Sequence, residues 1–284
     1  MKHYKAIFFD WDGTAVLSRK APAEEVASCM APLLESGVKL AIISGTTYDN
    51  IAGGQLHRYF SPAQLQNLFL GLGRGAFEYG FDDQGEPVML SSRIPDKDQL
   101  LQIHDACYQI HRKLNGQYDL DTDIVFSRPN YCKIDLMPNQ NRGDNLFLQD
   151  GESAMLQHRL QEHGIESVER LISMAESFGS GDLPLKATTD AKYLEVGPTG
   201  KCDNVNALFD RFGFSNEDCC FWGDEFIGVT DGIFGSDAGM ITEKTKTSDF
   251  FDVSDLKGIR PPEVRQLGGG VRTFLDFLRE QNKQ

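Results

Sequence analysis

The chain has 284 residues, of which 40% are hydrophobic and 25% charged, a composition typical of a globular protein with one large or two modest domains. Its 42 acidic residues outnumber 28 basic ones and give a formal net charge of −14, which argues against nucleic acid as a general partner. No apolar stretch is long enough to span a bilayer, so we expect no membrane segment. Six cysteines without a CxxC pair, and an N-terminus without a secretory signal pattern, lead us to expect a cytoplasmic protein.

The first third of the chain alternates strand and helix patterns. Residues 5–9 and 38–43 are short apolar runs of the kind that forms buried strands. Between them, a helical stretch begins near Pro22 and ends at Gly37, and a third strand is expected over residues 68–72. This strand–helix–strand order predicts an α/β fold with a doubly wound, Rossmann-like parallel sheet.

The pattern changes after the turn-rich segment at residues 81–87, which marks an exit from this first half. A helix, a strand pair, further helices and a second strand pair follow, and this order predicts an inserted α+β cap domain. From Lys201 onward the strand–helix rhythm of the first third resumes. We therefore expect a core domain at residues 1–85 and 191–284 and the cap at residues 86–190.

Three of the expected core strands end in polar residues. Asp10 and Asp12 follow the first strand, Ser44 the second, and Asp224 a strand at residues 219–222. Because ligands bind beyond the carboxyl ends of the strands in such sheets, these side chains can converge on one pocket. Carboxylates there favour a hard divalent cation such as Mg²⁺, and Lys201 at the start of a helix favours an anion. The combination suits phosphoryl transfer.

Four motifs together resemble the haloacid dehalogenase-like hydrolase superfamily. They are DWDGT at residues 10–14, IISGT at 42–46, GPTGK at 197–201 and WGDE at 222–225. Taken singly, three of the matched residues have a purely structural explanation. Ser44 can cap a helix, Lys201 can be a solvated surface residue, and Asp224 can form a turn. Their joint occurrence in this order favours the functional interpretation.

The resemblance implies a role for each matched residue. Asp10 would be the nucleophile that becomes an aspartyl-phosphate, and Asp12 the general acid–base. Ser44, Gly45 and Lys201 would bind the phosphoryl group. Mg²⁺ would be held by Asp10, the backbone carbonyl of Asp12, and Asp224. The family usually has a second acid a few positions later, often after asparagine; here Glu225 and Asp231 both qualify, and the sequence does not choose between them.

The segments at residues 73–77 and 193–201 resemble those that flank the cap in Cof-type sugar phosphatases and phosphomannomutases, with Arg74 where asparagine is usual. Residues 134–138, followed by Arg142, loosely resemble the strand that reads the sugar phosphate in the phosphomannomutase cap. This likeness implies that Arg142 contacts substrate, although it can equally be an exposed charge.

The expected activity is Mg²⁺-dependent hydrolysis of a small-molecule phosphate monoester, with a sugar phosphate as the expected partner. A large cap argues against protein substrates, because a macromolecule cannot easily enter a covered pocket. A phosphomutase uses the same four motifs, and a non-catalytic module that binds a metabolite is the alternative from another class. The sequence does not determine the oligomeric state.

Overall fold

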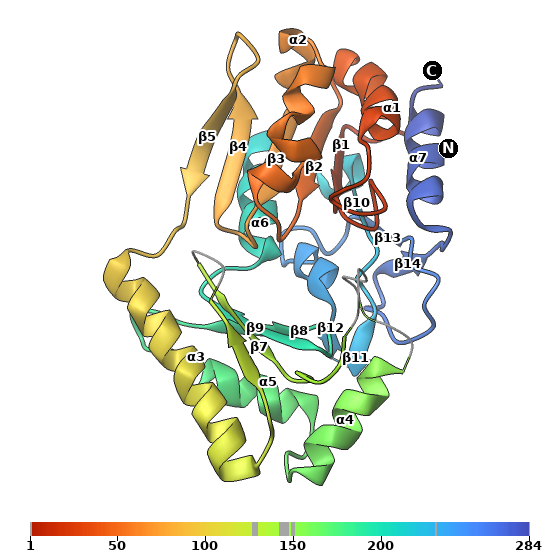
Figure 1. Ribbon diagram of the computed structural model, residues 1–284. Coiled ribbons are helices and arrows are strands. Elements are labelled where there is room, and N and C mark those ends of the chain that lie inside the picture. Colours follow the sequence, from red (N-terminus) through yellow and green to blue (C-terminus); the bar gives the residue numbers. More distant parts are fainter. Residues whose placement is uncertain (1, 127–129, 142–147, 149–150, 231, 284) are drawn as a thin grey trace.

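The computed structural model describes residues 2–126, 130–141, 148, 151–230 and 232–283 (Figure 1). Among these residues the larger sheet has eight strands, in the order β14–β13–β10–β1–β2–β3–β4–β5. The six strands from β14 to β3 are parallel to one another, whereas β4 pairs antiparallel with both β3 and β5. The strands are β1 (Ala6–Phe9), β2 (Lys39–Ile43), β3 (Leu68–Leu72), β4 (Phe77–Phe81), β5 (Pro87–Ser92), β10 (Cys219–Gly223), β13 (Asp249–Asp252) and β14 (Val264–Gln266).

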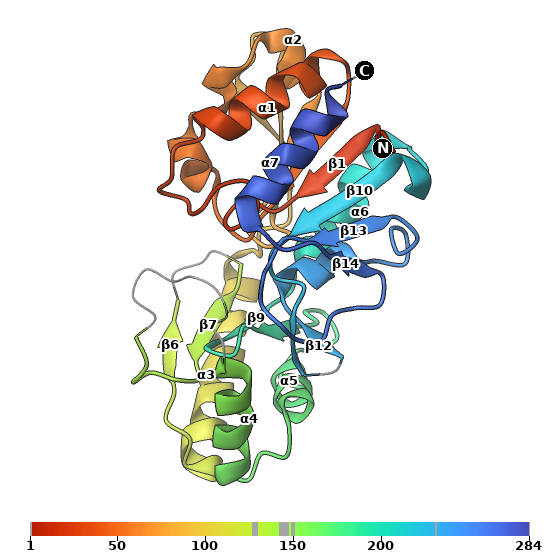
Figure 2. The ribbon, with the colours of Figure 1, turned by 90° about the vertical axis from the view of Figure 1, so that its right-hand side faces the viewer.

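Helices cover both faces of this sheet, which is why its central strands are apolar throughout (Figure 2). Side chains alternate along β1: Ile7 and Phe9 pack toward α1 and α7, whereas Ala6 and Phe8 pack toward α6. Phe8 also stacks on Phe221 of β10, with ring centroids 4.6 Å apart. The doubly wound α/β core predicted from the sequence is confirmed. Its helices are α1 (Glu24–Glu35), α2 (Pro62–Leu65), α6 (Lys201–Phe212) and α7 (Gly270–Gln281).

The cap has its own sheet and its own hydrophobic core. In the described part of the chain, its strands are antiparallel in the order β6–β7–β9–β8. This sheet faces the core domain, and the helices lie on its far side (Figure 1). The elements are β6 (Asp123–Val125), β7 (Cys132–Asp135), β8 (Lys186–Thr189), β9 (Tyr193–Gly197), α3 (Lys97–Tyr118), α4 (Glu152–Glu162) and α5 (Val168–Glu176).

The sheets divide the chain at other points than the expected boundaries. β5 lies in the range expected for the cap, but it pairs with β4 in the large sheet. β9 lies in the range expected for the core, but it pairs with β7 and β8 in the sheet of the cap. The turn-rich segment closes a β-hairpin, in which the Asp82 carboxylate accepts hydrogen bonds from the N–H groups of Gln84 and Glu86. Turn chemistry marks a reversal of the chain, but it does not say which domain follows.

A second hairpin leaves the core and reaches the cap. Its strands are β11 (Gly228–Thr230) and β12 (Ile233–Phe234), and they lie next to α4 and β8. Ile227, which precedes the hairpin, is buried in the hydrophobic core of the cap. This hairpin therefore joins the two domains beside the site.

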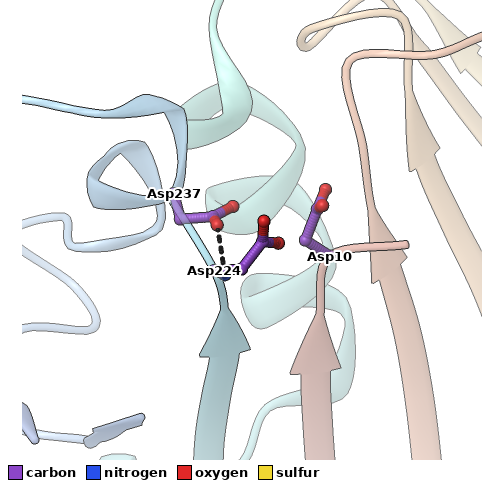
Figure 3. A group of neighbouring side chains, drawn as sticks. All are labelled: Asp10, Asp224 and Asp237. Carbon is purple, nitrogen blue, oxygen red and sulfur yellow. Dashed lines mark hydrogen bonds between the residues drawn. The ribbon is translucent and has the colours of Figure 1, made fainter. Parts of the chain in front are cut away.

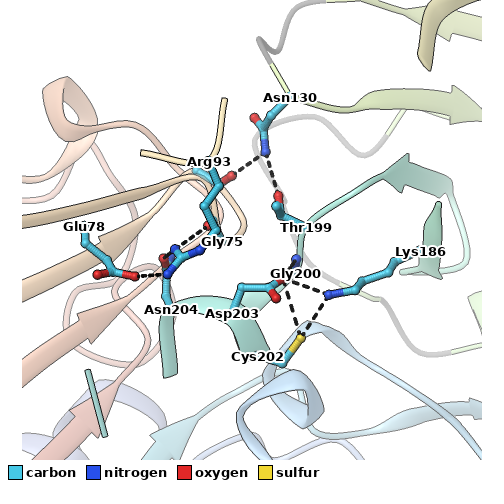
Figure 4. Close-up of polar contacts among 11 residues, drawn as sticks. Gly75, Glu78, Arg93, Asn130, Lys186, Thr199, Gly200, Cys202, Asp203 and Asn204 are labelled. Carbon is cyan, nitrogen blue, oxygen red and sulfur yellow. Dashed lines mark hydrogen bonds and ion pairs between the residues drawn. The ribbon is translucent and has the colours of Figure 1, made fainter. Parts of the chain in front are cut away.

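Polar contacts tie the two chain crossings between core and cap together (Figure 4). At the first crossing, Arg93 forms an ion pair with Glu78 and donates to the carbonyl of Gly75 at 3.2 Å. At the second, Lys186 of the cap pairs with Asp203 of α6 at 2.8 Å. The Arg93 contacts anchor the first crossing on the core, and the Lys186–Asp203 ion pair joins the cap to α6. No helix in the described chain combines the length and apolarity that crossing a membrane requires.

Candidate active site

The residues selected from the sequence converge at the carboxyl ends of β1, β2 and β10. They line a cavity of about 680 Å³ that lies between core and cap. Lys201 is the first residue of α6, so its side chain enters the cavity from the end of that helix. Arg142 and Asp231 lie outside the described residues. The predicted residues that line the cavity are Asp10, Asp12, Ser44, Gly45, Lys201, Asp224 and Glu225.

Two glycines let the acidic residues approach one another. Gly13 has a φ of 85°, and a Cβ there would lie 2.3 Å from Oδ2 of Asp224. A Cβ on Gly223 would lie 2.3 Å from Oδ2 of Asp237. Thr14, directly after the turn, donates its hydroxyl to Oδ1 of Asp224 at 2.7 Å. The glycine of the DWDGT motif is therefore needed for space as well as for its backbone conformation.

Replacing Gly13 by alanine should disturb both the fold and the acidic cluster. We expect Gly13→Ala to lower the free energy of unfolding by about 2 kcal/mol or more, because it adds a steric clash to an unfavourable positive φ. Urea denaturation measures this loss. Gly37→Ala is the matched control, because Gly37 also has a positive φ of 88° but no atom within 4 Å of its Cβ position. Equal losses in the two variants would refute the steric argument.

Three acids form the centre of the site: Asp10 and Asp237, which are buried, and Asp224, which is half-buried (Figure 3). One ligand atom of each lies within 4.8 Å of the others. Asp237 belongs to a short 3₁₀ helix, Ser236–Met240, and is fully buried. Its Oδ2 accepts from the backbone N–H groups of Asp224 at 2.9 Å and Glu225 at 2.7 Å. These bonds fix Asp237 against the end of β10.

Lys201 bridges two acids of the cluster. Its Nζ donates to Oδ1 of Asp10 at 2.8 Å and to Oδ1 of Asp237 at 2.6 Å. Burial lowers the pKa of Lys201, but the charges of Asp10 and Asp237 more than offset burial, so its pKa is raised and it remains a cation. Ser44 is buried at the end of β2, and its hydroxyl accepts from the N–H of Thr46 at 3.3 Å.

The charges of the cluster fit a divalent cation. Three carboxylates face one ammonium group, so two negative charges are uncompensated when all three acids are ionised. Burial raises the pKa of Asp10; the charge of Lys201 opposes this shift, and that of Asp237 adds to it. Burial and the charge of Asp237 also raise the pKa of Asp224. Buried carboxylates of this kind are hard oxygen ligands, and Mg²⁺ would relieve their repulsion. The residues present therefore fit the ion that the sequence predicts.

Asp12 lies in a different environment from Asp10. Its Oδ2 is 3.2 Å from Nη2 of Arg19, and its Oδ1 is buried without a hydrogen-bond partner among the described residues. Burial raises the pKa of Asp12, although the charge of Arg19 opposes this shift. The shift favours the protonated form of Asp12, which is the form that a general acid needs.

Of the two acids that the sequence offers to complete the metal site, Glu225 is described, and it lies beside the cluster. Its Oε2 accepts from the hydroxyl of Ser236 at 2.7 Å, and its backbone N–H binds Asp237. Asp237 was missed because the β11–β12 hairpin separates it from Asp224. The sequence signal that could have found it is Gly235-Ser236-Asp237, an acid in a segment of turn-forming residues.

These carboxyl groups make stability depend on pH. Burial, then the charge of Asp237, raises the pKa of Glu225 from 4.5 to about 7. A carboxyl group with a higher pKa in the folded state contributes stability at low pH, and this contribution is lost as the pH rises through the folded value. We expect the Tm of the metal-free protein to fall between about pH 4.5 and pH 7, and Mg²⁺ to raise the Tm more at pH 7 than at pH 4.5. Differential scanning fluorimetry with and without chelator measures both; a metal-free Tm that rises over this range would contradict the argument.

Comparison with known proteins supports the same architecture. No protein-family model matches the sequence, and no curated protein does. Among solved structures, an IMP-bound mutant of Plasmodium falciparum IMP-nucleotidase is similar with a TM-score of 0.63 and 15% identity, over 98% of this chain and 67% of that chain. The N-terminally truncated nucleotidase gives 0.53 and 17%, over 84% of this chain and only 64% of its own length.

A sucrose-phosphatase from Synechocystis, solved with sucrose and phosphate, is similar along the whole of both chains. The alignment covers 99% of each with a TM-score of 0.57 and 11% identity. At such identities the likeness establishes the fold. The chain thus shares with these proteins a doubly wound α/β core with an inserted cap, the fold that its sequence predicts.

Proposed function

We propose that this protein is a Mg²⁺-dependent phosphatase that hydrolyses a phosphate monoester of a small molecule, with a sugar phosphate as the expected substrate. The observation that carries the proposal is Lys201, whose ammonium group bridges Asp10 and Asp237 beside Asp224 in a covered cavity. The solved structures of similar fold include an IMP-nucleotidase and a sucrose-phosphatase. Free cysteines throughout the described chain agree with the cytoplasmic location that we also propose.

In the proposed reaction Asp10 is the nucleophile. One of its carboxylate oxygens bonds to phosphorus while the bond from phosphorus to the leaving oxygen breaks, and Asp12 donates a proton to that oxygen. Asp12, now ionised, then takes a proton from water as the water attacks the aspartyl-phosphate, which releases phosphate and regenerates Asp10. Lys201, Ser44 and the backbone of Gly45 bind the phosphoryl oxygens during both steps.

Mg²⁺ would be held by Asp10, Asp224 and Asp237 with the backbone carbonyl of Asp12, and it would neutralise the repulsion between carboxylate and phosphate. The cap limits the substrate to molecules that fit a cavity of about 680 Å³, a volume typical of small-molecule sites. By covering the site, the cap also keeps bulk water away from the phosphoryl group.

A panel of phosphate esters tests the proposal. The protein is incubated with Mg²⁺ and hexose, pentose and nucleoside monophosphates, and both free phosphate and isomerised sugar phosphate are measured. We expect release of phosphate. Isomerisation of hexose 1-phosphates without release would identify a phosphomutase, and no turnover of any ester would support the metabolite-binding module.

A further inference from the structure

Arg74 lies in the wall of the cavity, in the loop that follows β3. Its φ of 55° is in the left-handed region, which asparagine tolerates better than arginine does. The residue is only 5% exposed. A backbone conformation of this kind persists only where the surrounding structure holds it, and such residues cluster at active sites and ligand clamps.

The backbone fixes Arg74 beside the phosphoryl-binding end of β2. Its N–H donates to the carbonyl of Ser44 at 3.4 Å. The next residue, Gly75, packs on the other chain crossing so closely that a Cβ there would lie 2.3 Å from the carbonyl oxygen of Gly200. Arg74 is thus held at a set position relative to the bound phosphoryl group, independently of its own side chain.

The guanidinium group reaches from the core to the cap. Its Nε lies 3.4 Å from Oε2 of Glu195, its Nη2 donates to Oγ1 of Thr188 at 3.1 Å, and it lies 5.3 Å from the ring centroid of Tyr131. The buried Nη1 has no hydrogen-bond partner among the described residues. Leaving a buried charged donor unpaired is unfavourable, and an oxygen atom of a bound molecule would relieve that cost.

The neighbouring charges indicate which kind of oxygen this would be. In the described part of this wall, Arg74 and Lys133 both contact the carboxylate of Glu195, Lys133 at 2.5 Å, and Asp190 lines the wall beside them. Lys186, the next cation in the lining, pairs with Asp203 at 2.8 Å. The charges are balanced, so a second anionic group would remain uncompensated. A hydroxyl group fits, because it accepts from a guanidinium and donates to a carboxylate.

We propose that Arg74 recognises the leaving group, with Nη1 donating to a hydroxyl oxygen of a sugar or polyol phosphate whose phosphoryl group lies at Asp10. The inference rests on the phosphatase activity proposed above, and it adds the residue that selects among phosphate esters. An ester without such hydroxyls, for example p-nitrophenyl phosphate, has no acceptor for this donor. Its rate of hydrolysis should therefore not depend on Arg74.

The test compares two substrates in Arg74→Asn, which removes the guanidinium and suits the positive φ. We expect kcat/KM for the best hexose or pentose phosphate to fall about 10- to 100-fold, and that for p-nitrophenyl phosphate to change less than about threefold. A decrease that is equal for both substrates, or absent for both, would overturn the inference. Wild-type protein that prefers p-nitrophenyl phosphate to every sugar phosphate would do the same.

Asn130→Ala is the matched control for a purely structural role. Asn130 also joins cap and core, since it donates to the carbonyl of Gly73 at 2.8 Å and to Thr199 at 3.2 Å (Figure 4). Asn130 is not among the residues that line the cavity. We expect this variant to lower both activities by one common factor. If Arg74→Asn follows the same pattern, Arg74 only holds the cap. Failure of the phosphatase proposal looks different, because wild-type protein would then hydrolyse neither substrate.

Discussion

Asp10→Asn should abolish phosphate release while leaving the protein folded. We expect kcat to fall by about 10⁴-fold or more, because the amide cannot form the aspartyl-phosphate and the remaining groups can only orient the substrate. Stability should change little. The amide oxygen of asparagine can still accept from Lys201, and Lys201 keeps its ion pair with Asp237, so no buried charge loses its only charged partner. Phosphate release and the Tm measure the two effects.

A buried aspartate outside the cavity provides the matched control. Asp252 ends β13, is fully buried, and pairs with Arg260. We expect Asp252→Asn to show the opposite behaviour: a lower free energy of unfolding, because it leaves a largely buried guanidinium without its charged partner, and nearly normal kcat. If Asp10→Asn retains more than about a tenth of wild-type kcat, Asp10 is not the nucleophile.

Removal of the metal should stop the reaction, and Asp237 should control how tightly the metal binds. We expect chelation to abolish activity and Mg²⁺ to restore it. Asp237→Asn should raise the Mg²⁺ concentration for half-maximal activity at least about tenfold, because it removes one of three carboxylates that can hold the ion. Asparagine can still accept from the N–H groups of Asp224 and Glu225, so the local fold should survive.

Glu225→Gln tests whether Glu225 contributes to Mg²⁺ binding as Asp237 does. The Glu225 carboxylate accepts from Ser236, and glutamine can keep that bond, so we expect the Mg²⁺ requirement to change less than about threefold. Titration of activity with Mg²⁺ and isothermal titration calorimetry measure the requirement and the affinity. If Glu225→Gln raises the Mg²⁺ requirement more than Asp237→Asn does, then Glu225 is the metal ligand and Asp237 is not.

Short-range patterns were enough to predict the frame of the site. The apolar run before Asp10 is a buried strand, and Gly13 breaks it in a turn that the chain can form only without a side chain. Lys201 begins a helix, as its position after Gly200 predicts. Each of these features depends on a few neighbouring residues, and they can therefore be predicted from the sequence alone.

Other features depend on which distant segments meet. Asp237 joins Asp224 because a hairpin folds out toward the cap and brings the chain back to the end of β10, which spacing in the sequence does not reveal. The segment at residues 87–92 became a core strand because its partner, β4, lay at an open edge of the sheet. Turn signals indicate a reversal but not the pairing that follows it.

The sequence by itself determined the α/β core, the insertion of the cap and the acids at the strand ends, because periodicity and turn residues are encoded locally. Only the tertiary structure decided that Asp237 completes the acidic cluster and that Arg74, with a buried donor left unpaired, lies in the wall of the cavity. Both depend on contacts between segments far apart in the chain, and those contacts are fixed by the order of strands in the sheet and by the packing of the cap on it.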